Sequence, residues 1–222
     1  MPYNGRMKKI LDRIRKPKKS SSRGSMLRDA VLLALLGIAL GVFAKYLDEL
    51  ALDDRIWWHL LVEKLDLVGV FSGLPVWLVL TLTIAVCSRS PARAALNGFV
   101  FLLGMCLAYH AYTIVFAGFN PDRYMMIWYT LTAASPLLAA VCWYGRSAHN
   151  AAIVIDVLIF AVLTVSCFSV GWVYIGLNGI VNAALFAVPV IVLWQKPKQI
   201  LIGVLGGAAL AVAIAPLLPF SL

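Results

Sequence analysis

The sequence predicts an all-α membrane protein, a bundle of six or seven transmembrane helices with one further helix at the outer membrane surface. Two observations carry this prediction. Of the 222 residues, 62% are hydrophobic and 13% are charged, and the mean hydropathy is +0.90. Soluble domains contain about 25% charged residues, so this chain lacks the polar surface of a soluble enzyme. The apolar residues also form runs of about 20, the length that spans a bilayer.

Seven apolar segments are candidate spans, and together they cover most of the chain. They form one domain over residues 29–222, which follows a basic tail over residues 1–28. The last segment is rich in glycine and ends near Pro216 and Pro219, so it either crosses the membrane or dips in and returns, which leaves six spans. The segments lie at residues 29–47, 72–87, 95–117, 124–143, 151–170, 173–194 and 200–219.

The basic residues define the orientation of this multi-pass bundle. Fifteen of the 19 Lys and Arg residues lie in the tail and in the loops after the second, fourth and sixth segments, whereas seven of the ten acidic residues lie on the other side. Basic loops stay in the cytosol, so we place the N-terminus there and the protein in the cytoplasmic (inner) membrane. The net charge of +9 is therefore an orientation signal, and we expect no nucleic-acid partner. We interpret the tail as disordered chain, with a short basic helix on anionic lipid as the alternative.

Small residues recur along one face of the first segment, with spacings of 4, 3, 4 and 3. Such residues let two helix backbones approach closely. The stripe therefore either packs inside the bundle or docks a partner subunit, and the sequence leaves both possibilities open. It consists of Ala30, Ala34, Gly37, Gly41 and Ala44. The last segment carries a second stripe, which consists of Gly203, Gly207, Ala211 and Ala215.

The connection between the first two segments contains its own helical pattern. Apolar residues share one face over residues 53–68, Asp53 and Asp54 can cap the start, and Trp57 and Trp58 prefer the headgroup region. We predict an interfacial helix there on the outer surface. It is either a lid over an outward-facing cavity or a spacer.

Aromatic and polar side chains gather near the outer ends of the third and fourth segments. His110 lies between Tyr109 and Tyr112, and Trp128 and Thr132 are one helical turn apart. Aromatic walls with one imidazole and a hydroxyl suit a small amphipathic ligand. We therefore predict a ligand site formed by Tyr109, His110, Trp128 and Thr132. The alternative is an aromatic belt at the membrane surface, which does not account for the deeper His110.

Ionisable groups at membrane depth are costly, so Asp156 in the fifth segment is a site candidate. It either locks two helices together or carries a proton in a carrier mechanism. Its candidate partners are Arg93, Arg146 and Asn97. The sixth segment adds two intramembrane amides one turn apart, Asn178 and Asn182, which can bind a ligand or a neighbouring helix.

Motifs for catalysis are absent from the sequence. It contains no Walker A loop, no H-E-x-x-H and no G-x-S-x-G, and Asp156 alone cannot form an aspartyl dyad. The four cysteines fall in four different segments and form no C-x-x-C pair. We therefore expect no enzyme activity, no catalytic residue, no metal site and no cofactor.

The overall plan resembles the substrate-binding S components of bacterial energy-coupling-factor uptake systems. Ala30 and Ala34 match the A-x-x-x-A pattern that these proteins carry near the start of the first helix. The resemblance implies a compact bundle of about six helices, a coupling subunit docked on the first helix and a vitamin-like ligand bound from the outer side. The basic tail and the seventh segment depart from that family.

These observations together predict a membrane protein of small-molecule transport. It would bind a small amphipathic or vitamin-like ligand from the outer side and dock partner subunits through Ala30, Ala34, Gly37 and Gly41. The alternative is a non-transport protein, such as an immunity, sensor or assembly factor, that acts by binding another membrane protein. A third possibility is a proton-coupled carrier that uses Asp156.

Overall fold

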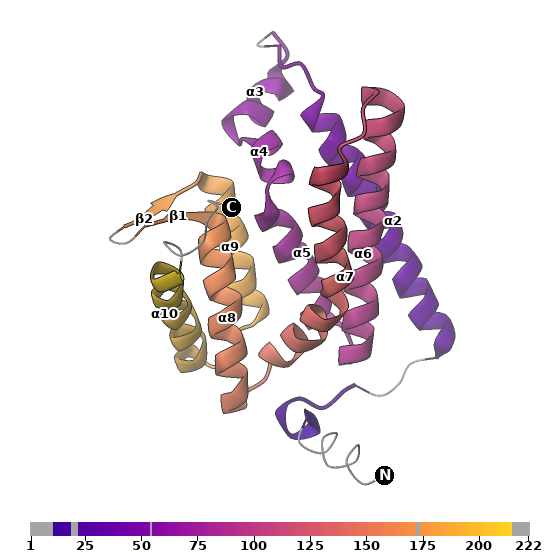
Figure 1. Ribbon diagram of the computed structural model, residues 1–222. Coiled ribbons are helices and arrows are strands. Elements are labelled where there is room, and N and C mark those ends of the chain that lie inside the picture. Colours follow the sequence, from indigo (N-terminus) through magenta and orange to yellow (C-terminus); the bar gives the residue numbers. More distant parts are fainter. Residues whose placement is uncertain (1–10, 19–21, 54, 172–173, 215–222) are drawn as a thin grey trace.

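The computed structural model describes residues 11–18, 22–53, 55–171 and 174–214, which form a bundle of helices (Figure 1). Within these described residues, five helices are long and apolar enough to cross a membrane. They are α2 (Arg23–Asp48), α6 (Pro91–Tyr112, extended by the π-helical turn η1, Thr113–Ala117), α7 (Asp122–Gly145), α8 (Asn150–Cys167) and α10 (Pro197–Ile214). This architecture agrees with the predicted helical membrane protein.

Two further apolar helices are shorter than a bilayer. The helix α5 (Leu74–Cys87) has 14 residues and α9 (Ile180–Val192) has 13. At 1.5 Å per residue they extend about 20 Å, less than the ~30 Å hydrocarbon core. By length alone the described residues therefore contain five spanning helices. Of the six or seven predicted spans, two are helices too short to cross the hydrocarbon core.

The helices form two groups that lie side by side in Figure 1. In the first group, α2 packs along α6, and α6 also contacts α5 and α7. In the second group, α8 packs along α10 and contacts α9. The groups meet where α5 and α7 contact α8, and where α5 contacts α9. Side chains from α5, α7 and α8 therefore share the space between the groups.

The basic segments gather at one end of the bundle, which we call the basic end. There the backbone N–H of Lys18 donates to the carbonyl oxygen of Arg89 (2.9 Å), and the Gln199 side chain donates to the carbonyl oxygen of Ser147 (2.8 Å). These bonds join the tail to the α5–α6 turn, and α10 to the α7–α8 turn. The basic loops that the sequence assigns to one side thus share one end of the fold.

Part of the N-terminal tail is bound to this end. Residues 11–14 are helical, and the Ser147 hydroxyl donates a hydrogen bond to the carbonyl oxygen of Ile14. The interpretation of the tail as disordered chain is therefore wrong for residues 11–18, which pack on the bundle. Residues 1–10 and 19–21 lie outside the described residues.

The predicted interfacial helix is two short helices, α3 (Trp57–Lys64) and α4 (Leu67–Ser72). The break falls at Asp66, which adopts a left-handed conformation with φ of 47°. Its carboxylate accepts a hydrogen bond from the backbone N–H of Gly69 (3.3 Å) and caps α4. Asp tolerates this conformation because its short side chain bonds the local backbone. Asp54, one predicted cap, lies outside the described residues.

The predicted sixth segment, residues 173–194, is not one helix. The chain leaves α8 into a hairpin of β1 (Phe168–Val170) and β2 (Ile175–Leu177), and α9 begins only at Ile180. Gly179 has φ of 106°, which ends any helix before it because only glycine adopts this backbone readily. Asn178 therefore precedes α9, and only Asn182 is helical. In the predicted seventh segment, residues 215–219 lie outside the part of the chain that the structure describes.

Candidate functional site

The described residues form a groove of about 410 Å³ between α5, α7 and α8. Its walls are apolar apart from a few hydroxyls and one thiol, and its polar hydroxyl groups belong to Thr81, Thr132 and Ser135. The side chains on its rim, Leu137 and Leu138 of α7 and Val162 of α8, are exposed. In a membrane this groove would open sideways to lipid, because exposed leucine and valine prefer hydrocarbon to water.

A proline in α7 accompanies the groove. Pro136 has no N–H, so the carbonyl oxygen of Thr132 loses its helical hydrogen bond. The Ser135 hydroxyl donates to that carbonyl instead (2.7 Å). Figure 1 shows the lower part of α7 turning toward α8, as expected of a proline kink. Residues of α7 on both sides of Pro136, from Trp128 to Cys142, line the groove opposite α8.

One hydroxyl in the groove is without a partner. The oxygen of Thr81 is buried and makes no hydrogen bond among the described residues. Its neighbour Thr83 makes the ordinary bond to the carbonyl four residues back, that of Val79 (2.7 Å). The Thr132 hydroxyl lies 3.3 Å from the sulfur of Cys106. Buried polar groups are nearly always paired, so Thr81 is an exception among the side chains that line the groove, and its oxygen is covered by protein atoms.

The structure divides the predicted ligand residues among three places. Trp128 and Thr132 line the groove. Tyr109, together with Trp128, lines a separate cavity of about 10 Å³, which has room for about one water. His110 lies apart from both: its Nε2 donates to the side-chain oxygen of Asn120 (2.7 Å), and its Nδ1 shares a hydrogen bond with the Tyr129 hydroxyl (3.0 Å). These four residues do not form one outward-facing pocket.

Tyr109 belongs to a polar cluster at the end opposite the basic end. Its hydroxyl donates to Asp48 (2.6 Å), and the Ser72 hydroxyl donates to the same carboxylate (2.6 Å). The buried Lys45 pairs with Glu49 and lies over the Tyr109 ring, 5.6 Å from its centre. This cluster ties α2, α4 and α6 together, which accounts for Tyr109 without a ligand.

The small-residue stripe of α2 is covered by α6. Ala30, Gly37 and Gly41 are buried, and a Cβ added at Gly37 would overlap the carbonyl oxygen of Phe101. A Cβ added at Gly104 of α6 would lie 2.6 Å from the carbonyl oxygen of Ala34. Of the two interpretations of this stripe, internal packing is therefore what the structure shows, and the docking face proposed from sequence is occupied by the chain itself.

The stripe of α10 is also internal. A Cβ added at Gly207 would lie 2.5 Å from the Phe160 side chain, and one added at Gly203 would lie 3.1 Å from that of Asp156. Both contacts are with α8. Ala211 of this stripe is also buried, and Ala215 lies outside the described residues.

Asp156 is completely buried between α8, α10 and the end of α7. Its Oδ2 accepts a hydrogen bond from Gln199 (2.8 Å), which also donates to Ser147 as described above. Its Oδ1 has no partner among the described residues. The hydrogen-bond partner of Asp156 is thus none of the three residues predicted from sequence. It is Gln199, which lies more than 40 positions further along the chain, on α10.

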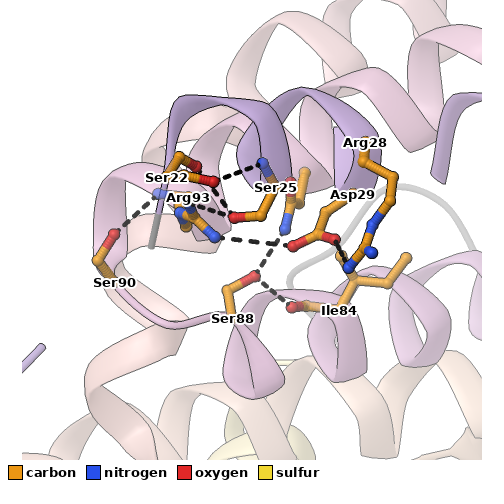
Figure 2. A network of polar contacts seen from close by, with 9 residues as sticks. Ser22, Ser25, Arg28, Asp29, Ile84, Ser88, Ser90 and Arg93 are labelled. Carbon is orange, nitrogen blue, oxygen red and sulfur yellow. Dashed lines mark hydrogen bonds and ion pairs between the residues drawn. The ribbon is translucent and has the colours of Figure 1, made fainter. Parts of the chain in front are cut away.

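The three predicted partners are engaged elsewhere or exposed. Figure 2 shows Arg93 beside Asp29, with an N–O distance of 3.6 Å, in a network that joins the start of α2 to the α5–α6 turn. Asn97 donates to the hydroxyl of Ser88 (3.1 Å). Arg146 is exposed after the end of α7. The network of Arg93 and Asp29 in Figure 2 thus holds the start of α2 against α6 at the basic end.

The amides of the predicted sixth segment bond locally. Asn182 donates to the carbonyl oxygen of Asn178 (2.9 Å), and the Ser169 hydroxyl of the hairpin donates to the Asn178 side chain. The side-chain oxygen of Asn182 is buried and has no partner in the described ranges. Asn178 therefore braces the hairpin against the start of α9.

Besides Arg93, Arg15 of the N-terminal tail also makes contacts at the basic end. The Arg15 guanidinium lies over the Trp143 ring, 4.1 Å from its centre, and donates to the carbonyl oxygens of Val86 (3.0 Å) and Trp143. These carbonyls stand at the C-terminal ends of α5 and α7, where a cation is favourable. Burial, followed by the charge of Arg146, lowers the pKa of Arg15 to about 10.

Sequence reasoning missed Thr81, Gln199 and Arg15. Nothing in the sequence distinguishes Thr81 from Thr83, because both are threonines in one apolar helix. Gln199 and Arg15 act through contacts with distant helices. In the part of the chain that the structure describes, no three His, Cys, Asp or Glu side chains gather as a metal site would require.

No protein-family model, no curated protein and no solved structure matches this chain.

Proposed function

We propose that this protein is an integral membrane protein that binds an amphipathic small molecule in the groove between α5, α7 and α8. The groove itself carries the proposal. Its volume of about 410 Å³ lies within the ~300–1,000 Å³ of small-molecule sites. Its apolar walls, with the hydroxyl residues Thr81, Thr132 and Ser135 among them, suit a ligand that is mostly hydrocarbon.

The proposal keeps the amphipathic ligand expected from sequence but changes its route. The cavity beside Tyr109 is too small for a vitamin-like molecule, whereas the groove has an exposed apolar rim that faces lipid in a membrane. The ligand therefore enters sideways from the bilayer. Transport of this ligand, and the resemblance to S components, remain predictions.

The alternative of a protein that acts by binding another membrane protein has less support. Exposed small-residue stripes would favour that function, because they allow close helix contact. Both the α2 and α10 stripes pack on helices of the same chain.

We propose further that all seven apolar helices pass between the two membrane surfaces, with the N-terminus in the cytosol. The chain alternates between the basic end and the opposite end from α2 to α10 (Figure 1). The short helices α5 and α9 are preceded by α4 and by the hairpin, which add length on the side opposite the basic end. The positive-inside rule places the basic end in the cytosol.

Filling the groove tests the proposed function. Val162 lies on the groove wall and is 51% exposed, so Val162→Trp should occupy the space of the ligand. Long-chain amphiphiles should raise the unfolding midpoint of purified protein freed of lipid. The apparent affinity obtained from this shift should be at least about tenfold weaker in Val162→Trp. The expected loss reflects about 1.4 kcal/mol or more of excluded ligand contact.

Val154→Trp is the matched control. Val154 lies on the same helix and is 62% exposed, but it does not line the groove. This variant should bind amphiphiles like the unaltered protein. Equal binding by both variants, or no stabilisation by any amphiphile tested, would overturn the proposed function.

A further inference from the structure

We infer that the ligand of the groove is an anionic phospholipid of the bilayer, with an acyl chain in the groove and its phosphate headgroup between Arg15 and Arg146 at the basic end. This inference rests on the proposed function and adds the class and direction of the ligand. It combines three properties of the described residues: the position of Arg15, the lack of a carboxylate beside it and the length of the groove.

Arg15 lies where the groove ends. Ala85 of α5 and Cys142 of α7 line the groove. The next residues along the chain, Val86 and Trp143, supply the two carbonyl oxygens that Arg15 binds. The guanidinium is therefore one residue beyond the groove wall on both helices, at the basic end.

The positive charge there has no carboxylate partner. The ion pairs of the described ranges are Arg28 and Arg93 with Asp29, and Lys45 with Glu49. Arg15 instead contacts an aromatic ring and carbonyl oxygens. The nearest acid in sequence, Asp12, acts electrostatically on Tyr144 and pairs with neither arginine in this part of the chain.

Arg146 adds a second cation close to the first, because it follows the end of α7 only three residues after Trp143, whose carbonyl oxygen Arg15 binds. Its charge contributes to the lowered pKa of Arg15, which at about 10 still leaves Arg15 protonated at neutral pH. Two neighbouring guanidinium groups without an acid form a site for a phosphate, which accepts their paired N–H donors. An anion there would also relieve the repulsion between them.

The dimensions of the groove select a lipid chain. Its wall on α5 runs from Leu74 to Ala85, about 16 Å at 1.5 Å per residue. That length is about half of the ~30 Å hydrocarbon core, the thickness that one leaflet fills. A chain of this kind joined to a phosphate at the basic end is a phospholipid of the leaflet on that side.

The test compares two lipids with identical acyl chains, phosphatidylglycerol and phosphatidylcholine, on the purified full-length protein. Thermal stabilisation and native mass spectrometry should show tighter binding of phosphatidylglycerol. Arg146→Gln should reduce this preference about fivefold, the effect of one charge near a headgroup. Arg146→Gln is the decisive variant, since Arg15 also holds α5 and α7 together. Arg123→Gln, an exposed arginine at the opposite end, should leave the preference unchanged.

The outcomes separate the two proposals. Equal binding of the two lipids, with both still blocked by Val162→Trp, would overturn this inference and leave the proposed function standing. An unchanged preference in Arg146→Gln would also overturn it. If neither lipid binds but another long-chain amphiphile does, this inference fails alone, whereas if no amphiphile binds, the proposed function fails with it.

Discussion

At the scale of single residues, the described interior contains a carboxylate whose only hydrogen-bond donor is neutral. Asp156 is fully buried, receives one hydrogen bond from Gln199 and leaves its other oxygen without a partner. Burying an acid without a cation is unfavourable, and a charge left without compensation is strongly so. The close packing of Gly145 and Gly203 around it leaves little room for other donors. Asp156 is thus held by helix packing more than by its own bonds.

Asp156→Asn should stabilise the protein by about 1 kcal/mol or more. Asparagine keeps the size of the side chain and still accepts the hydrogen bond from Gln199, but it removes the charge. The midpoint of thermal unfolding in detergent measures the change. A midpoint that falls instead would contradict this account and would mean that the carboxylate itself stabilises the contact between α8 and α10.

Gln199→Leu gives the opposite change at the same contact. It removes the donor to both Asp156 and the carbonyl of Ser147, so it should destabilise the protein by about 2–3 kcal/mol. The same unfolding assay measures it. A neutral effect would show that water or another group replaces the amide.

At the scale of elements, the contact between α2 and α6 depends on residues without side chains. Gly37 and Gly41 of α2 bring its backbone against the carbonyls of Phe101 and Met105. Lipid chains provide no hydrophobic drive between such helices, so close backbone packing is what joins them. The polar network of Figure 2 fixes the same pair of helices at the basic end.

Gly37→Leu should therefore destabilise the bundle by about 3 kcal/mol or prevent folding, because overpacking forces the two helices apart. Ala39→Leu, two residues along and exposed, adds a similar side chain without this contact and should be neutral. Fluorescence-detected size-exclusion chromatography and the unfolding midpoint compare the two. If Gly37→Leu folds as well as Ala39→Leu, the stripe is free for a partner and the packing described here is wrong.

At the scale of the whole molecule, the two ends of the bundle differ in charge. The predicted orientation places the basic end in the cytosol, which thiol labelling can measure. Cys87 is exposed at the end of α5, near the basic end, and Leu52 is exposed in the loop after α2 at the opposite end. Both variants have Cys106, Cys142 and Cys167 replaced by alanine. In the first, which also carries Cys87→Ala and Leu52→Cys, an impermeant maleimide should label the cysteine at position 52 in intact cells.

Cys87 alone should react with the same reagent only after the cells are opened. This pair of variants reports the two ends of the same bundle, so each serves as the control for the other. The reverse pattern of labelling would mean that the basic end faces outward.

The sequence predicted the helical membrane architecture and the gathering of the basic loops at one end. Both follow from local properties, namely the length of apolar runs and the placement of charge between them. It was less successful at residues 168–180, where apolar content suggested a helix but Gly179 and the strands of the hairpin interrupt it. Hydropathy alone does not distinguish an apolar strand from an apolar helix.

The candidate site was decided by tertiary structure. Thr81, Ser135 and Val162 meet in one groove although they are far apart in the chain, and the pairing of Asp156 with Gln199 joins two helices that are not consecutive. Hydropathy and charge act along the chain, and they determined by themselves which segments are apolar and which loops are basic. Which small residues face inward, and where the helices leave a hollow, depends on how the helices tilt and pack against one another, because close packing is a property of pairs of surfaces.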